Sequence, residues 1–522
     1  MQQLKSLRFR PGRLAATALL TVALATGWAG GAAAADRAST VIVAMAGQIN
    51  TLDPMRADYS QTNLIASAVY DTLVTYDAER KLVGRLATEF SLAPDVKSIT
   101  MTLRSDVKFH DGTPLTAKDV AYTLDRLKRL GAGVASLIEG YESTTVVDDT
   151  HLTINLNKPY SLFLGSLSKI YILNSALVEA NLGADDGQGW LQGNDAGSGP
   201  YVLDGITAQD VSFSRFDGYW EQVERRPEAL VYRRIDEGAT RRDELLAGNI
   251  DIGLAMADRD AAALASNPAL KVALLQSPVQ TEILFNTRVG PTADKRLRRA
   301  LRLVYDYEGG LASIRGNNGV IANGPLPTPL NCRPDLPAAK RDLEAAKAAL
   351  AELSLDGVTL KMNFQPAFDA QKQEATLFQS NMRDVGVQLE LEPIAFPNYL
   401  ASLKDPEMIP QMMLLEDFAQ FPDPGIVLVK GYHSNAIGTN RTGYSNPDVD
   451  ALLDAALAEP DESRRCEIYK QVQTILYDDA VMIDMYTLRK PAVYYPEKVE
   501  APVASPTSSS ISLADVRLAP KS

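Results

Sequence analysis

The chain has 522 residues, of which 46% are hydrophobic and 22% charged, and its formal net charge is −13. This length exceeds what one hydrophobic core usually supports, so two or three domains are expected. The acidic balance repels nucleic acid and anionic membranes and argues against both as partners. Only two cysteines, Cys332 and Cys466, are present. A disulfide-dense scaffold is therefore excluded, and one bridge or two buried thiols remain as alternatives.

The first 35 residues have the pattern of a secretory signal peptide. Four basic residues precede the apolar run LAATALLTVALATGWAG, and GAAAAD follows with a small-residue cleavage site at Ala35. The run is too short and too rich in Ala and Thr for a membrane anchor. Cleavage near Ala35 removes these four positive charges and no negative ones, so the exported chain would carry a net charge of −17.

The first part of the exported chain is predicted to be rich in strands. Residues 40–48 read as a strand, and residues 64–77 have apolar side chains at helical spacing. Residues 98–112 alternate as half-buried strands do. Thr116, three residues before Asp119, predicts the start of a helix over 116–130. Further on, the predicted elements are a hairpin over 144–160, strands over 211–220 and 229–236, a helix over 240–251, a strand over 282–287, a helix over 293–307 and a Gly/Pro-rich loop over 317–337.

The last third alternates between helices and strands, which is typical of an α/β lobe. The predicted helices are 341–353, 374–386, 447–459 and 463–479, and the predicted strands are 358–366 and 387–396. The final segment, 508–520, could return as a strand to the first lobe.

The residue sets that define common enzymes and metal sites are missing from the sequence. His110, His151 and His433 are the three histidines, and none has a second ligand at metal-binding spacing. No G-x-S-x-G and no G-x-x-x-x-G-K-[ST] motif occurs. We therefore predict no catalytic residue, no metal and no cofactor. His110, before the Asp111-Gly112 turn, is interpreted as a turn-stabilising residue.

Several segments in series resemble one protein family. KFHDGTPLTAKDVAYTLDRL, TLDPMRADYSQTNLIASAVYDTLVTYD, GSGPYVL with FDGYWEQ, DELLAGNIDIG, ILFNT and NPDVDALLDAAL are similar to the blocks of bacterial extracellular solute-binding proteins of family 5, the oligopeptide/dipeptide/nickel class. The resemblance implies an α/β, two-lobe fold of the periplasmic-binding-protein type with an additional inserted domain. It also implies a binder, not an enzyme, that feeds an ABC importer.

The resemblance further implies three domains. Domain I would be discontinuous, over 36–78, 197–285 and 488–522. Domain II, the inserted domain, would span 79–196, and domain III would span 286–487. The expected protein is a periplasmic monomer that closes on a small-molecule or peptide ligand and delivers it to the permease in the inner membrane. The alternative is a sensory or chaperone-like binding protein that presents its ligand to another partner.

The ligand-binding stretch departs from the family pattern. Peptide-binding members carry a stretch like G-W-x-A-D-Y-P-D-P, whose Asp meets the peptide ammonium. Here Gln420 stands at that Asp, and Asp417 stands at the Trp. In one hypothesis Asp417 or Glu416 takes over the cation. In the other, which we favour, the ligand has no free ammonium at that point, as in an opine-like compound, a sugar conjugate or a modified peptide, because an amide compensates a buried charge poorly.

Other candidate contacts follow from the same resemblance. Phe418 belongs to the stretch that carries Gln420. Asp58, Tyr59 and Ser60 match positions that face the ligand in the family, and the Tyr59 ring could stack on a sugar or a peptide plane. Asn440 and Arg441 lie in a polar loop, from which Arg441 could bind a carboxylate or phosphate through two hydrogen bonds.

Overall fold

Strand β1 (Thr40–Met45) is the first strand of the computed structural model, which describes residues 36–47, 49, 51–57, 60–353 and 357–521. The predicted signal peptide, residues 1–35, lies outside the described residues. The chain from Asp36 onward forms one compact unit. Within the described ranges, no helix combines the length and apolar character needed to cross a bilayer.

The main sheet contains eleven strands and mixes parallel and antiparallel pairs. Its order is β15-β14-β16-β12-β17-β11-β1-β10-β9-β8, and β13 pairs with β17 off this path. The strands after β1 are β8 (Tyr201–Ile206), β9 (Asp210–Arg215), β10 (Ala229–Arg234), β11 (Ile252–Gly253), β12 (Lys271–Phe285), β13 (Gly319–Ile321), β14 (Thr359–Phe364), β15 (Gln388–Pro393), β16 (Met412–Phe418) and β17 (Met482–Tyr494).

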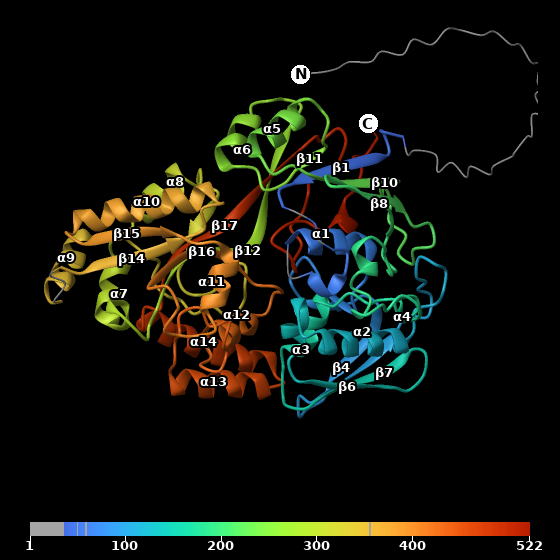
Figure 1. The fold of residues 1–522 in the computed structure, drawn as a ribbon, viewed down its shortest axis with the longest axis horizontal. Helices are drawn as coiled ribbons and strands as arrows, with labels where there is room; N and C mark the ends of the chain where they lie inside the picture. Colours follow the sequence, from blue (N-terminus) through green and yellow to red (C-terminus); the bar gives the residue numbers. More distant parts are fainter. Residues whose placement is uncertain (1–35, 48, 50, 58–59, 354–356, 522) are drawn as a thin grey trace, which may run out of the picture. The chain divides into compact units, whose positions relative to one another are not determined.

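Two long antiparallel strands, β12 and β17, join the two ends of this sheet. Near Lys271, β12 pairs with the end of β17 at Tyr494, where β17 also pairs with β11. Near Phe285, β12 instead pairs with β16. The register between β12 and β17 shifts between Gln276 and Gln280. Figure 1 shows β12 and β17 side by side, with β14, β15 and β16 toward one end and β1, β10 and β11 toward the other.

A separate four-stranded sheet occupies the region predicted as the inserted domain. Its order is β4 (Ala87–Leu92), β5 (Ser98–Leu103), β7 (His151–Leu156) and β6 (Tyr141–Val146). Helix α2 (Ala117–Leu130) packs against β6. The Asp119 carboxylate accepts a 2.8 Å hydrogen bond from the Thr116 N–H, as in a capping box. The predicted helix and the predicted β6–β7 hairpin are both confirmed, and β2 (Val74–Tyr76) and β3 (Leu82–Gly84) form a small pair beside this region.

Several of the remaining helices pack on the main sheet and complete a second core. Ile283, Leu360, Phe378 and Leu414 are buried together in that core, between sheet and helices. The longer helices are α1 (Ser60–Val69), α5 (Gly238–Leu246), α6 (Asp258–Leu264), α7 (Lys295–Arg302), α8 (Tyr307–Ser313), α9 (Leu343–Ala351), α10 (Asp369–Asp384), α11 (Phe396–Ser402), α12 (Pro424–Tyr432), α13 (Pro447–Ala458) and α14 (Glu462–Asp478), and the shorter ones are α3 (Phe163–Ser166) and α4 (Ser175–Glu179). Short 3₁₀ helices span Pro54–Arg56, Gly133–Ile138, Leu167–Lys169, Trp190–Gln192, Pro291–Ala293 and Leu513–Asp515.

Two of the places where the structure differs from the sequence predictions lie in the first and last parts of the chain. The helix predicted over 64–77 ends at Val69, and 74–76 form β2. Asp71, which is fully buried, accepts hydrogen bonds from Arg85 and Tyr219, so tertiary contacts override the helical spacing here. The strand expected over 508–520 is a 3₁₀ turn at Leu513–Asp515 with one isolated bridge at Leu518. The three predicted domains stay a prediction.

His110 links two segments of the fold through its ring nitrogens. Its Nδ1 is 2.7 Å from the Asp195 carboxylate, and its Nε2 is 3.0 Å from the Gly199 carbonyl oxygen. The ring packs edge-on against Phe216. Both partners can only accept hydrogen bonds, so the geometry favours a ring protonated on both nitrogens. His110 thus ties the turn at 111–112 to the GSGPY segment and belongs to the architecture of the fold.

Candidate functional site

One face of strand β12 forms a wall of a pocket. Successive side chains of a strand point to opposite faces, so Gln280, Glu282 and Leu284 share one face while Ile283 and Phe285 enter the core. The three even-numbered residues line the pocket. Its volume is about 150 Å³, which suits a small solute or one end of a larger one.

Strand β16 pairs with β12 and extends the same wall through the same alternation. Gln280 pairs directly with Asp417 across the two strands, and Asp417 faces the pocket. Glu416, one residue earlier, faces the other way. Its carboxylate lies 2.9 Å from Arg315 and 2.7 Å from Lys490. Burial alone would raise the pKa of Glu416, but Lys490 and Arg315 lower it to about 2. Glu416 is therefore committed to an internal ion cluster and does not line the pocket, contrary to the expectation from the sequence.

Helix α12 closes another side of the pocket, and its start is well defined. The Asp423 side chain caps the helix by accepting a 2.8 Å hydrogen bond from the Gly425 N–H, and Pro424 takes the first position, where its missing N–H costs nothing. Ile426, Lys430 and Tyr432 of this helix line the pocket. Further lining residues include Val427 and Gly431 of the same helix, Ala419, Pro325, Pro327, Thr439 and Thr442, with Ser136 from the region predicted as the inserted domain.

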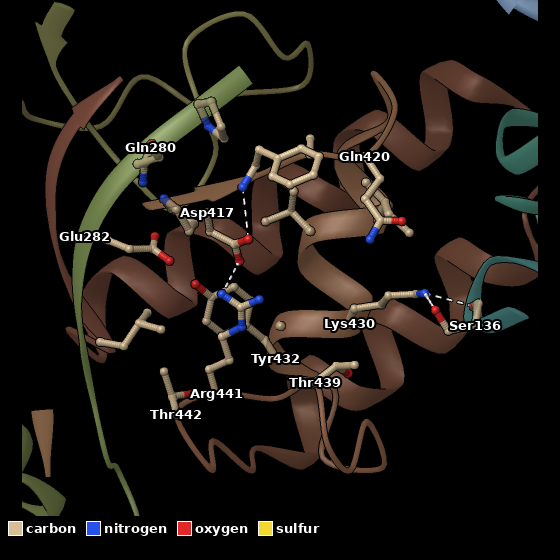
Figure 2. Close-up of a pocket in the computed structure, with 18 residues that line it drawn as sticks. Ser136, Gln280, Glu282, Asp417, Gln420, Lys430, Tyr432, Thr439, Arg441 and Thr442 are labelled. Carbon is tan, nitrogen blue, oxygen red and sulfur yellow. Dashed lines mark hydrogen bonds and ion pairs between the residues drawn. The ribbon is translucent and has the colours of Figure 1, made fainter. Parts of the chain in front are cut away.

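A group of three ionisable side chains lies together in the pocket. Figure 2 shows the carboxylates of Glu282 and Asp417 and the guanidinium of Arg441 pointing toward one another. Arg441 and Asp417 form an ion pair of 2.9 Å. Glu282 is only 6% exposed, and no ion pair to it is found among the residues that the structure describes. Burial, followed by the charge of Asp417, raises the pKa of Glu282 well above its ordinary value.

Lys430 connects two segments of the pocket wall that are distant in sequence. Its Nζ donates to the carbonyl oxygen of Ser136 at 2.8 Å and lies 3.0 Å from the Ser136 Oγ. Figure 2 shows this contact at the side of the pocket opposite Glu282. Burial lowers the pKa of Lys430 to about 8. Because Ser136 belongs to residues 79–196 and Lys430 to residues 286–487, the bond joins these two segments at one side of the pocket.

Four of the sequence-predicted site residues come together here. Asp417, Phe418, Gln420 and Arg441 all line the pocket. Within the described part of the chain no hydrogen bond holds the Gln420 amide, so its donor and acceptor groups are free for a ligand.

Other predicted site residues lie elsewhere. Asn440 is buried and holds its own loop, because its amide nitrogen donates to the carbonyl oxygens of His433 and Tyr444. The Ser60 hydroxyl is 3.0 Å from that of Ser509, and neither Asn440 nor Ser60 lines the pocket. Asp58 and Tyr59 lie outside the described residues.

Sequence reasoning missed Gln280, Glu282, Lys430 and Ser136. Glu282 carried a usable signal, because a carboxylate inside the apolar run EILF is rare in a buried strand without a functional or pairing reason. Gln280 and Lys430 carried none, since each becomes a lining residue only through the pairing of β12 with β16 and the packing of α12. Among the described residues, no three His, Cys, Asp or Glu side chains are arranged to hold a metal ion.

A disulfide anchors the loop that completes the pocket. Cys332 and Cys466 are bonded, with their Cα atoms 4.9 Å apart. The bridge attaches the loop carrying Pro325 and Pro327 to helix α14, and the Gln473 amide donates to the Cys332 carbonyl oxygen at 2.6 Å. The alternative of two buried free thiols is thereby excluded.

Comparison with known proteins gives one consistent result. The family described as bacterial extracellular solute-binding proteins, family 5 Middle, matches residues 81–439. The "Probable D,D-dipeptide-binding periplasmic protein DdpA" of Escherichia coli K12 is 27% identical over 503 residues, which cover 92% of this chain and 93% of that protein. The glutathione-binding protein of Salmonella typhimurium is 25% identical, and the match covers 86% of this chain and 89% of that protein.

Solved structures agree on the fold. The ABC transporter substrate-binding protein CtaP from Listeria monocytogenes superposes with a TM-score of 0.81 at 21% identity, covering 92% of this chain and 99% of that one. AgaA of A. tumefaciens R10, solved with agropinic acid, superposes with a TM-score of 0.77 at 19% identity. The match covers 92% of this chain and 99% of AgaA. The α/β fold of the periplasmic-binding-protein type that the sequence predicts is confirmed.

Proposed function

The chain belongs to the bacterial extracellular solute-binding proteins of family 5, and from this premise we propose that it captures a small polar solute in the periplasm for an ABC importer. The solute is a peptide, an opine-like compound or a sugar-containing conjugate, and it is handed to the inner-membrane permease. Relatives whose names specify D,D-dipeptides and glutathione, and a structure containing agropinic acid, support this ligand range.

The observation that carries the proposal is the pocket. Its lining combines charged and amide side chains with apolar ones, and Ser136 and Lys430, from distant parts of the chain, meet at one side of it. A solute that contacts both parts stabilises the closed arrangement, and it can do so only by binding that arrangement better than the open one. The volume of about 150 Å³ favours a small solute over a long peptide.

Native mass spectrometry of the protein purified from its own host tests the proposal. We expect a retained small molecule that is released on denaturation, and solution scattering that changes when this molecule is removed and returned. Gln420→Ala should weaken binding at least tenfold, about 1.4 kcal/mol, in calorimetry. Gln373→Ala, at an exposed position of α10, is the matched control. A protein that retains and binds no solute contradicts the proposal, and unchanged affinity in Gln420→Ala removes Gln420 from the site.

A further inference from the structure

We propose that Glu282 and Gln280 form a subsite for a positively charged nitrogen of the solute, so that the ligand is an amine. This inference rests on the proposed function and specifies its ligand. It concerns a different part of the pocket from Gln420, where the sequence argues against an ammonium group. The two residues share one face of β12, and both line the pocket.

The first step of the argument is the balance of charge. Asp417 and Arg441 neutralise each other through their 2.9 Å ion pair. Lys430 donates to Ser136 at the far side of the pocket. Glu282 is therefore left as a buried carboxylate to which the described residues supply no ion-pair partner. Ionising Glu282 in this buried environment is costly, and a ligand cation would offset that cost.

The second step is the balance of hydrogen bonds. Gln280 is 2% exposed, and its amide nitrogen donates to the carbonyl oxygen of Gly324 at 3.1 Å. Its amide oxygen has no hydrogen-bond partner among the residues that the structure describes. A buried acceptor without a donor loses free energy. The Gln280 oxygen thus lacks a donor on the strand face where Glu282 has no ion-pair partner, and an ammonium group supplies three N–H donors at once.

The third step concerns the proton on Glu282 before the ligand arrives. Burial and the Asp417 charge raise the pKa of Glu282, so the empty pocket favours its protonated form. The charged and titratable groups that face Glu282 from neighbouring elements are Asp417 of β16, Asp484 of β17, Arg441, Tyr399 of α11 and Tyr432 of α12. A bound ammonium group favours the ionised carboxylate, so ligand binding releases this proton to solvent.

Proton release gives the subsite a pH signature with a definite sign. Between about pH 5 and pH 7 an α-ammonium group stays charged. Over this range the affinity of an amine ligand should rise with pH, because less work is needed to ionise Glu282. In Glu282→Gln the rise should disappear, and the affinity should fall at least tenfold at pH 7. Glu282→Asp keeps a carboxylate and should therefore retain part of the affinity at pH 7 and part of its rise with pH.

Calorimetry with matched compounds tests the inference. The probes are the free proteinogenic amino acids, the L,L and D,D forms of dialanine, and glutathione. Each probe is compared with its N-acetylated counterpart. We expect wild-type protein to bind one or more free amines and to bind the acetylated form at least tenfold more weakly. Glu344→Gln is the control variant, because the same change is made on a side chain that is 90% exposed.

The outcomes separate the inference from the proposed function. Equal binding of an amine and its acetylated form, equal affinity in wild type and Glu282→Gln, or a natively retained solute without a basic nitrogen each overturns the amine subsite while the solute-binding function stands. A wild-type protein that binds none of the amines but retains another solute also overturns it. A protein that binds no solute of any kind removes the proposed function together with the inference.

Discussion

Individual side chains in this protein take their roles from which face of a strand they occupy. Glu416 and Asp417 are neighbours in sequence, yet Glu416 joins the buried cluster of Arg315 and Lys490 while Asp417 enters the pocket. The sequence offered both as candidates for a cation contact. Only the register of β16 against β12 separates them, because a shift by one residue exchanges the two faces of a strand.

His110 gives a pH-dependent prediction at this scale. Burial alone would lower its pKa, but Asp195 and the Gly199 carbonyl oxygen raise the pKa above the unfolded value near 6.5. The stabilisation is fully present below that unfolded value and is lost as pH rises through the folded pKa. Urea unfolding at about pH 6 and pH 9 should therefore show wild type losing free energy of unfolding as pH rises.

Two variants make the His110 prediction specific. Asp195→Asn should remove most of this pH dependence and cost about 1–3 kcal/mol below pH 6.5, because it discharges a buried hydrogen-bonded partner. His151→Gln, at an exposed histidine, should leave the pH dependence as in wild type. A pH dependence that is the same in wild type and Asp195→Asn would contradict the assignment.

At the scale of elements, helix α12 carries one wall of the pocket. Its start at Asp423-Pro424 could be read from the sequence, because an N-cap Asp followed by Pro is a helix-start signal. The packing of this helix could not be read from the sequence. Gly425 faces Tyr469 of α14 and Leu162 so closely that a Cβ atom there would lie 2.6 Å from Leu162 Cδ2. The helix position, and with it Lys430, depends on this close approach.

Gly425→Ala should therefore destabilise the protein by about 1–3 kcal/mol, the usual cost of overpacking. It should also weaken solute binding, because the displaced helix moves its lining residues. The matched control is Gly431→Ala in the same helix, where a Cβ atom meets nothing within 4 Å. That variant should be as stable as wild type or slightly more so. Thermal unfolding of both variants measures the difference, and equal midpoints would contradict the close approach.

At the scale of the whole molecule, one covalent link joins segments that are distant in sequence. The Cys332–Cys466 disulfide closes a loop of 134 positions. Such links stabilise mainly by restricting the unfolded chain, with a typical effect of about 2–4 kcal/mol. The link also fixes the loop of Pro325 and Pro327 against α14 beside the pocket.

The double variant Cys332→Ser/Cys466→Ser should lose about 2–4 kcal/mol in urea unfolding. It should also bind the natural solute more weakly, because the loop that lines the pocket gains freedom. Wild type treated with a reductant should behave like the variant, whereas the variant itself should not respond to the reductant. An unchanged free energy of unfolding on reduction would show that the bridge contributes nothing to stability.

The sequence by itself determined much of this protein: the class of fold, the binder's role, the capped helix α2 and the β6–β7 hairpin. It also offered the stretch from Asp417 to Gln420 as candidate ligand contacts, and the structure places this stretch along the pocket. These follow from local signals and from motifs that recur in order along the chain. Tertiary structure alone decided that helix α1 ends at Val69, that Cys332 meets Cys466, and that Gln280, Glu282, Lys430 and Ser136 surround one pocket. The physical reason is that a pocket consists of side chains brought together by strand pairing and helix packing, and neither their distances nor their unmet hydrogen bonds are encoded in any single segment.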